Sequence, residues 1–463
     1  MITPRASTNQ PAGAPAASPW PLWLSAARLL NVAALTFAVG ILLTIVLLAK
    51  VPMMRQVIFA NQPPDNDMGV NFTYFALLVA FAGPLAVLIY GLRHRWLSWR
   101  VVTAVWVLVI GTMAYLAYDD PVVILPISLE EFSPALKGDE VGYQLSTRFS
   151  GVKPDLKLDD KVTALVSNLS GKATDTDILR QHHDEIEVGW GNITVLRDWW
   201  GEMAALPRIG DLSRTNWDPN PAFTPIRAYS RYACAHAELL ALDGKGDEAL
   251  ATLGQLADVS QKLSATSRSL VRIMIAIVVN KMAITDANYV LDHGTTSPAA
   301  REKLAATLAE GLSGEAGARR MIMVEYVRQL PMYSTFHLDD LYTLSKAAGA
   351  SSDNDYSAQR SIWTHPLDLF DLLLTNPRAT ANLAGSYYSQ AAELAAKRLG
   401  GLAVLGENFE LSLESRSAIK NMGGRQLLSM AIPAYSKIIS EYWKEQDMRA
   451  ALLTRLKTID AAK

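Results

Sequence analysis

Residues Leu29–Ala49 read LLNVAALTFAVGILLTIVLLA and contain no Asp, Glu, Lys, Arg or His. Two further uncharged apolar runs follow at Tyr74–Leu92 and Val101–Tyr118, and the three runs are between 18 and 21 residues long. A helix rises about 1.5 Å per residue and the hydrocarbon core of a bilayer is roughly 30 Å thick, so each run can span a membrane. The sequence therefore predicts a transmembrane anchor of three helices at residues 25–118.

The short loop after the second run gives the strongest signal for topology. It reads RHRWLSWR and contains Arg93, Arg95 and Arg100. Short loops rich in Lys and Arg stay in the cytoplasm, so the N-terminus is also expected there and the C-terminal domain outside. Lys50 and Arg55, in the first loop, oppose this orientation but are fewer. A cleavable signal peptide is the competing interpretation, although its apolar region is normally only about 7–15 residues long.

Charge divides the chain into two parts. Residues 1–118 contain seven Lys or Arg and two Asp or Glu, whereas the remainder contains 36 basic and 43 acidic residues. A mildly acidic soluble part without a dense basic cluster argues against nucleic acid as a partner. Residues 1–24 are rich in Pro, Ala and Ser, which predicts a disordered tail.

Cysteine usage bears on both chemistry and compartment. Cys234 is the only cysteine, so no intramolecular disulfide and no cysteine-based metal site can form. Its helical, apolar context, YACAH, is typical of a buried structural thiol. An exported domain without disulfides, together with the short arginine loop, favours a bacterial inner membrane over other membranes, with the domain in the periplasm or outside the cell.

The rest of the chain predicts an all-α fold. Residues 119–158 form an expected connector with one or two short strands, because Val141, Tyr143 and Leu145 alternate with polar residues. From Asp159 to residue 463 the apolar spacing is helical, which predicts a large α-helical domain, with an irregular helical-repeat solenoid as one arrangement. Helices are expected at about 159–170, 175–204, 223–243, 246–264, 267–292, 298–312, 315–348, 377–399 and 416–459.

One segment resembles a known repeat. Residues 229–262 read as two helices joined by the turn LDGKGDEAL at 242–250, with Leu253, Leu256 and Ala257 following. Small residues at a tight helix contact and a glycine-containing turn make this segment similar to a tetratricopeptide hairpin. The resemblance implies a scaffold with a tendency to bind proteins. A generic helical hairpin is the alternative, since no second copy is evident.

Metal and catalytic candidates are sparse. His183 and Glu187 share a helix face at a spacing of four, as two ligands of one metal would, but no further ligand cluster accompanies them. Nucleophile elbows, phosphate-binding loops and dinucleotide fingerprints are absent. A solvated polar helix face explains this pair better than a metal site does, so no cofactor is predicted. The candidates of an enzyme hypothesis are His182, His183, Glu187, His337, Asp339 and Asp340.

An aromatic and arginine-rich segment is the favoured place for a partner-binding surface. Trp and Arg are common in binding hot spots, although helical cores also use Trp. The candidate residues are Trp190, Arg197, Trp199, Trp200, Arg208 and Trp217.

The sequence thus predicts a membrane-anchored scaffold or interaction protein of the cell envelope, with the lipid bilayer and another envelope protein as partners. A membrane-bound hydrolase or metal-dependent enzyme is one alternative. An accessory subunit of a transporter is another. Direct transport is disfavoured, because the three apolar runs contain no ionisable side chain except the terminal tyrosines.

Overall fold

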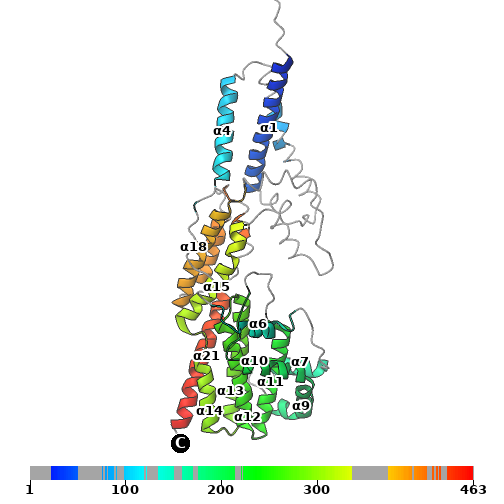
Figure 1. Ribbon diagram of the computed structural model, residues 1–463, viewed down its shortest axis with the longest axis vertical. Coiled ribbons are helices and arrows are strands. Elements are labelled where there is room, and N and C mark those ends of the chain that lie inside the picture. The colour runs from blue at the N-terminus through cyan, green and yellow to red at the C-terminus, as the bar shows by residue number, and fades with distance from the viewer. Residues whose placement is uncertain are drawn as a thin grey trace, which may run out of the picture. The chain divides into compact units, whose positions relative to one another are not determined.

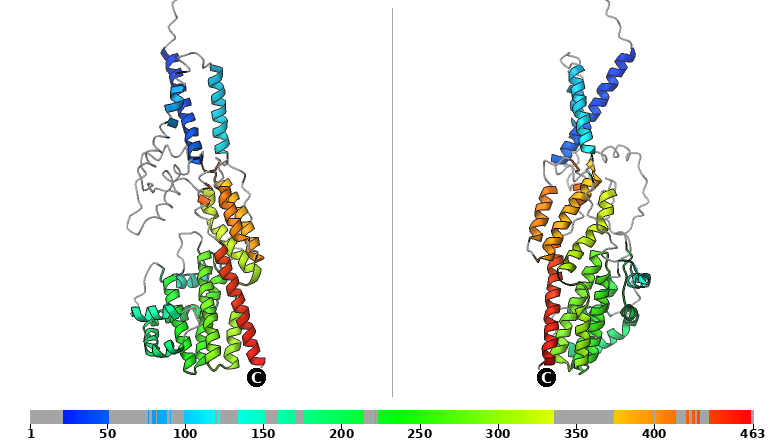
Figure 2. Two further views of the ribbon diagram at one scale, coloured as in Figure 1. Left: turned by 180° about the vertical axis from the view of Figure 1, so that it is seen from behind. Right: turned by 60° about the vertical axis from the view of Figure 1, so that its left-hand side comes forward.

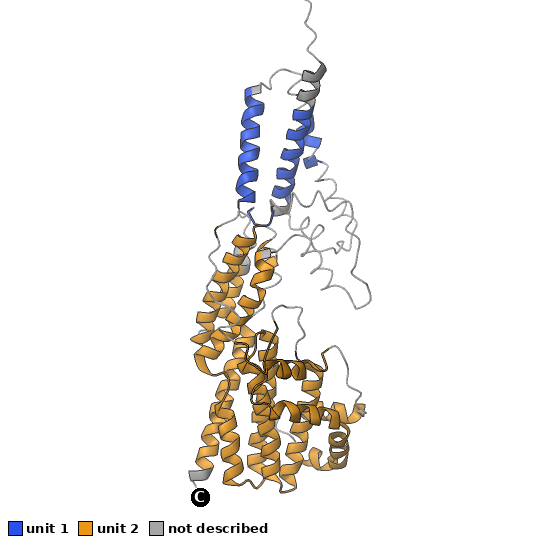
Figure 3. Cartoon of the chain, viewed as in Figure 1, with its two compact units in different colours: residues 1–118, 337–375, 416–422 blue, residues 119–336, 376–415, 423–463 orange. Residues whose placement is uncertain are grey.

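The structure is a computed structural model of the 463-residue chain. It describes residues 22–50, 76, 79–80, 82–87, 90, 99–118, 121, 134–150, 159–169, 176–213, 221, 223–335, 374–398, 401–413, 420–421, 424–425, 427–428 and 435–461. All regular secondary structure in these residues is helical, so the predicted all-α class is confirmed for them. The chain divides into two compact units, shown in blue and orange in Figure 3.

The first unit contains the apolar helices α1 (Leu22–Lys50) and α4 (Trp99–Ala117). The two helices pack through buried side chains that include Leu35 and Val109. Much of α4's remaining apolar surface is exposed, Val107 and Leu108 by more than 60%. This pattern suits a lipid environment, in which an exposed apolar surface is not penalised.

One polar contact joins these helices. The indole Nε1 of Trp106 donates a hydrogen bond to Asn31 Oδ1 over 2.8 Å. Within α1, the hydroxyls of Thr36 and Thr44 donate to backbone carbonyls one turn earlier. The polar side chains of the first apolar run are therefore satisfied locally, as an apolar medium requires.

Two of the three predicted spans appear as candidate membrane helices, by length and composition. They are Leu30–Leu47 and Arg100–Ala117. The run Tyr74–Leu92 is described only at residues 76, 79–80, 82–87 and 90, which are helical. The described residues thus hold two candidate spans where the sequence predicts three. Of the loop arginines, Arg93 and Arg95 lie outside the described residues, and Arg100 begins the second candidate span.

The second unit is a helical bundle (Figure 1). Its helices are α6 (Asp139–Thr147), α7 (Asp160–Leu169), α8 (Thr176–Gln181), α9 (His183–Asn192), α10 (Thr194–Ala205), α11 (Phe223–Leu242), α12 (Gly246–Ala265), α13 (Leu270–His293), α14 (Pro298–Ala309), α15 (Gly314–Thr335), α18 (Pro377–Ala396), α19 (Leu402–Leu413) and α21 (Tyr435–Ala461).

Helices α11, α12 and α13 contact one another and form the centre of this unit. Helix α14 packs on α12, and the C-terminal helix α21 runs along α13 and α14, as two views show (Figures 1 and 2). Helix α13 is buried over most of its length, with Ile273, Ala276 and Val279 each at most 2% exposed. The apolar stretch around 270–279 therefore belongs to the core of the bundle.

Local sequence signals explain where the central helices begin and end. Gly244 has φ 79°, a left-handed conformation that glycine adopts without strain, and it turns the chain from α11 into α12. Ser297 caps α14 by accepting a hydrogen bond from the amide of Ala300 over 3.2 Å, with Pro298 at the first helical position. The predicted helical hairpin at 229–262 is therefore formed. Its kinship with tetratricopeptide repeats stays a prediction.

Other boundaries differ from the expectation. The alternating segment around Val141 is not a strand but helix α6, because Asp139 and Glu140 in its first turn favour a helix N-terminus. The single helix expected at 175–204 is three short helices, α8, α9 and α10. Helix α19 lies in a stretch for which no helix was predicted, and the helix expected from residue 416 is described as continuous only from Tyr435.

Candidate functional site

The second unit carries a groove among its described residues. It lies between α10, α12 and α14 and has a cavity volume of about 430 Å³. Its lining residues are Gly201, Ala204, Ala205, Asp247, Leu250, Ala251, Gly254, Gln255, Asp258, Ala300, Lys303, Leu304 and Thr307.

Helix α12 forms the floor of the groove. Asp247, Leu250, Ala251, Gly254 and Asp258 recur at three- and four-residue spacing, which places them on one face of the helix. They cover about three helical turns, or roughly 16 Å. The floor is therefore a strip of small and apolar side chains with a carboxylate at each end.

Two glycines leave the groove open. A Cβ atom built on Gly201 would meet no atom within 4 Å, and one built on Gly254 would meet only Leu304 Cδ1 at 3.9 Å. Neither glycine is therefore required for close packing within the chain. A helical glycine costs roughly 1 kcal/mol relative to alanine, so both positions give up stability and expose backbone in the groove.

The α10 wall is fastened to the floor by hydrogen bonds from both sides. The indole Nε1 of Trp200 on α10 donates to the carbonyl of Gln255 on α12 over 3.4 Å. In the other direction, Lys262 Nζ donates to the carbonyl of Ala204 over 2.9 Å and to Asp258 Oδ2 over 2.6 Å. Trp200 is fully buried, so it links α10 to α12 without lining the groove itself.

The α14 wall is fastened at its N-terminus. The backbone amide of Ser297, the cap of α14, donates to Asp247 Oδ1 over 2.6 Å. This hydrogen bond stabilises the carboxylate form and lowers the pKa of Asp247. Asp247 therefore stays ionised at neutral pH, at one end of the groove floor. Gly246 next to it lies so close to the backbone of Thr295 that a Cβ there would fall 2.4 Å from the Thr295 oxygen.

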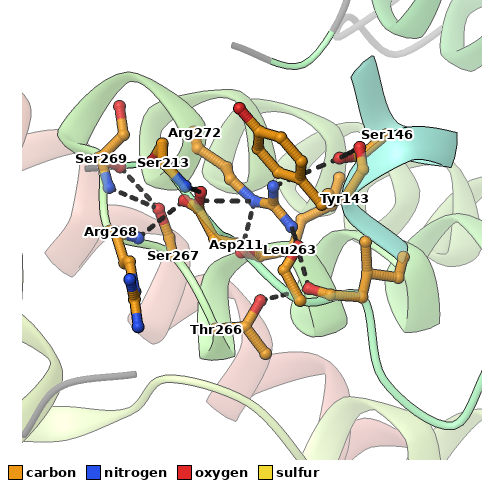
Figure 4. A network of polar contacts seen from close by, with 12 residues as sticks. Tyr143, Ser146, Asp211, Ser213, Leu263, Thr266, Ser267, Arg268, Ser269 and Arg272 are labelled. Atoms are coloured by element: carbon orange, nitrogen blue, oxygen red, sulfur yellow. Dashed lines mark hydrogen bonds and ion pairs between the residues drawn. The ribbon is translucent and has the colours of Figure 1, made fainter. Parts of the chain in front are cut away.

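A buried network holds the chain where it leaves α10 (Figure 4). The guanidinium of Arg272 donates to the carbonyls of Ile209 and Gly210 over 2.9 and 3.1 Å and lies 3.9 Å from Asp211. Asp211 also accepts from the amide of Arg268 over 2.8 Å. Burial lowers the pKa of Arg272, and Asp211 opposes that shift. The network ties the segment after α10 to the start of α13, and so helps to fix the groove wall.

The predicted tryptophan and arginine residues separate into core and surface. Trp199 and Trp200 are fully buried, so neither indole is available to a partner and both belong to the core. The ring of Trp200 stacks on Tyr229 at 4.7 Å, and the Trp199 indole donates to the carbonyl of Leu145 over 2.7 Å. These two adjacent aromatic side chains therefore pack the short helix α10 against its neighbours.

Trp190 and Arg197 remain near the surface. Trp190 is half-buried and stacks on His236 at 4.5 Å, and the guanidinium of the exposed Arg197 lies 4.8 Å from the centre of the Trp190 ring. Arg208 has a structural partner, because its Nε donates to Asp139 Oδ1 over 3.0 Å. Trp217 lies outside the described residues.

The metal candidates are not brought together as a site. His183 Nε2 lies 3.3 Å from Asp243, whereas Glu187 pairs with His236 Nε2 at 3.2 Å. His182 pairs with Glu185. No group of three His, Cys, Asp or Glu able to hold a metal occurs within the residues that the structure describes. His337, Asp339 and Asp340 fall outside those residues.

The sequence prediction missed the groove. Its signal was present in α12, where small residues and carboxylates recur on one face, but the same spacing is typical of any packed helical hairpin. Arg272 was also missed, because an arginine beside apolar residues carries no local sign of burial, which here depends on the distant Asp211.

Comparison with known proteins gives no match, since no protein-family model, no curated protein and no solved structure matches the chain. Function therefore has to be inferred from the residues and their geometry.

Proposed function

We propose that this chain is a membrane-anchored interaction protein that holds a helical segment of a partner protein in the groove between α10, α12 and α14. The groove carries the proposal, because it is open, supported on both sides and lined by small side chains. Helix-in-groove binding is a common mode of peptide recognition, in which an amphipathic helix inserts its apolar face between helices of the receptor.

The lining residues define the chemistry of the occupant. Glycine and alanine on the floor allow a backbone to approach closely, which favours an occupant helix with small or apolar residues facing α12. Asp258 is already paired with Lys262, whereas the exposed carboxylate of Asp247 accepts hydrogen bonds from Ser297 and has no cation beside it at ion-pair distance in the described part of the chain. A basic residue of the occupant helix placed beside Asp247 would complement its charge. An acidic residue placed beside α14 would complement Lys303.

The two apolar helices supply the anchor in this proposal. Helices α1 and α4 would place the bundle at a membrane, in which their exposed apolar side chains face lipid. The arginine-rich loop at 93–100 supports an orientation with the bundle on the extracytoplasmic side of a bacterial inner membrane. The partner would then be another protein of the cell envelope.

Site-specific photo-crosslinking tests the proposal directly. In one variant, a photoreactive residue replaces Ala251 on the groove floor. In a control variant, the photoreactive residue replaces Gly191, an exposed position on α9 with open space around it. We expect one partner to crosslink from position 251 in the membrane and not from position 191.

Filling the groove provides the matching loss of function. Gly254→Leu adds a side chain where the structure has room and raises helix propensity, so the bundle keeps its fold. The crosslink and co-purification of the partner should fall at least tenfold. Gly191→Leu is the matched control and should leave both unchanged. Equal crosslinking from positions 251 and 191, or a partner retained by Gly254→Leu, would contradict the proposal.

A further inference from the structure

A second, much smaller cavity lies between α12, α13 and α21, away from the groove. Its volume is about 20 Å³, and the residues that line it are Ser260, Gln261, Ser264, Ile273, Ala276, Ile277, Asn280, Leu312, Tyr442, Glu445 and Arg449. Cavities that stay empty in protein interiors are apolar, whereas this one is lined by several polar side chains.

Three of the lining side chains have polar atoms without a hydrogen-bond partner. They are Ser260 Oγ, both Oε1 and Nε2 of Gln261, and Asn280 Oδ1. The three residues are at most 6% exposed. Buried polar groups are nearly always paired with protein or with ordered water, so a cluster of four unpaired atoms around one cavity calls for an occupant.

The charged neighbours already satisfy one another. Glu445 accepts from Asn280 Nδ2 and, over 2.6 Å, from Gln446 Nε2. Arg449 donates to the carbonyls of Glu310 and Leu312 over 3.0 and 2.8 Å. The unmet hydrogen-bonding capacity therefore belongs to the uncharged side chains.

The unpaired atoms form a mixed set of donors and acceptors. Gln261 Nε2 can only donate, its Oε1 and Asn280 Oδ1 can only accept, and the Ser260 hydroxyl can do both. A cation would be repelled by the amide hydrogens and by the nearby Arg449 guanidinium. Water both donates and accepts hydrogen bonds. A cavity volume of about 10–15 Å³ is enough for one water molecule.

We propose that one structural water occupies this cavity and bridges Gln261 and Ser260 on α12 with Asn280 on α13. Through Asn280 the bridge continues to Glu445 on α21. The water would thus complete a polar seam that holds the C-terminal helix against the centre of the bundle. This proposal is independent of the function of the groove.

Exchange of Gln261 for methionine tests the proposal by the sign of its effect. Methionine keeps the Cβ and Cγ atoms, over which Gly311 packs closely, and removes the polar end of the side chain. If water satisfies the amide, Gln261→Met breaks the bridge and lowers the denaturant midpoint of the full-length protein. If the cavity is dry, the same exchange removes unpaired polar atoms and raises the midpoint.

Gln181→Met, at an exposed position of α8 outside the groove and the cavity, is the matched control and should leave the midpoint nearly unchanged. A crystal structure at a resolution that shows ordered water gives a second measurement. A single density peak within hydrogen-bond distance of Gln261 and Asn280 is the expected result. An empty cavity, direct pairing of the two amides, or a midpoint that Gln261→Met raises or leaves unchanged would overturn the proposal.

Discussion

Arg272 holds its guanidinium in the protein interior, with 1% of its surface exposed. It reaches Ile209 and Gly210 through hydrogen bonds and lies near the carboxylate of Asp211. Removing the cation would leave the buried carboxylate of Asp211 without its counter-charge and would take one donor each from the Ile209 and Gly210 carbonyls. Breaking a buried ion pair in this way costs about 3–5 kcal/mol. We expect Arg272→Met to lower the free energy of unfolding by that amount and to loosen the end of α10.

Denaturation in urea, followed by the fluorescence of the buried tryptophans, measures this effect. Arg180→Met, which removes an exposed arginine from α8, is the control and should change the free energy of unfolding by less than about 0.5 kcal/mol. A loss for Arg272→Met no larger than that of the control would show that the buried network does not stabilise the fold.

Single residues also show what the sequence could not reveal. Trp199 and Trp200 share a helix with Arg197, and composition alone fits a binding surface as well as a core. Their burial depends on contacts with Leu145 and Tyr229, residues 54 and 29 positions away. Such long-range contacts have no local signature, whereas a cap such as Ser297 before Pro298 has one in the sequence itself.

At the scale of elements, two histidines join α9 to α11. His183 lies 3.3 Å from Asp243, and hydrogen bonds to Asp243 and Asp184 raise its pKa. His236 is largely buried, which lowers its pKa, and Glu187 on α9 opposes that shift. Arg197, Lys245 and Glu248 are the other charged groups that face His236.

These shifts have opposite consequences for stability. The contribution of His183 is present below pH 6.5, its ordinary pKa, and is lost as the pH rises through its raised folded value. The contribution of neutral His236 is present above pH 6.5 and is lost as the pH falls through its lowered folded value. The side chain of His183 is 38% exposed, so solvent screens its contribution.

We therefore expect α9 to loosen from α11 when the pH falls from about 7.5 to about 5.5, because the loosened state binds a proton on His236 more readily than the buried site does. Amide hydrogen exchange across α9, corrected for the intrinsic pH dependence of exchange, measures this. The loosening should disappear in His236→Gln and persist in His183→Gln. Equal pH dependence in His236→Gln and in the unmodified protein would contradict the assignment.

Elements were predicted best where breakers and amphipathic spacing agree. The helices from Phe223 to Ala309 follow the predicted ranges closely, because Gly244, Gly294 and Pro298 mark their ends. The prediction was wrong around Val141, where alternating residues form α6. The groove could not be predicted either, since it depends on how α10 and α14 lie beside α12.

At the scale of the whole molecule, composition separates an apolar, basic N-terminal part from a mildly acidic helical part, and the two compact units follow nearly the same division. The orientation across a membrane cannot be inferred from how the helices of either unit pack. It is inferred from the distribution of Lys and Arg in short loops, which determines orientation during insertion.

Cysteine labelling in intact cells tests the orientation, and the single native cysteine makes the protein suited to it. Cys234 is 1% exposed, and burial raises the pKa of its thiol, so it should stay unreactive in the folded protein.

Glu302→Cys places a thiol at an exposed position of α14 in the helical bundle. The cells are treated so that the outer membrane is permeable and the inner membrane stays intact. A maleimide that cannot cross the inner membrane should then label this variant, because the bundle is expected on the extracytoplasmic side. Ser98→Cys, in the arginine loop, is the matched control and should be labelled only after the inner membrane is permeabilised. The reverse pattern, with Ser98→Cys labelled first, would invert the topology and move the partner of the groove into the cytoplasm.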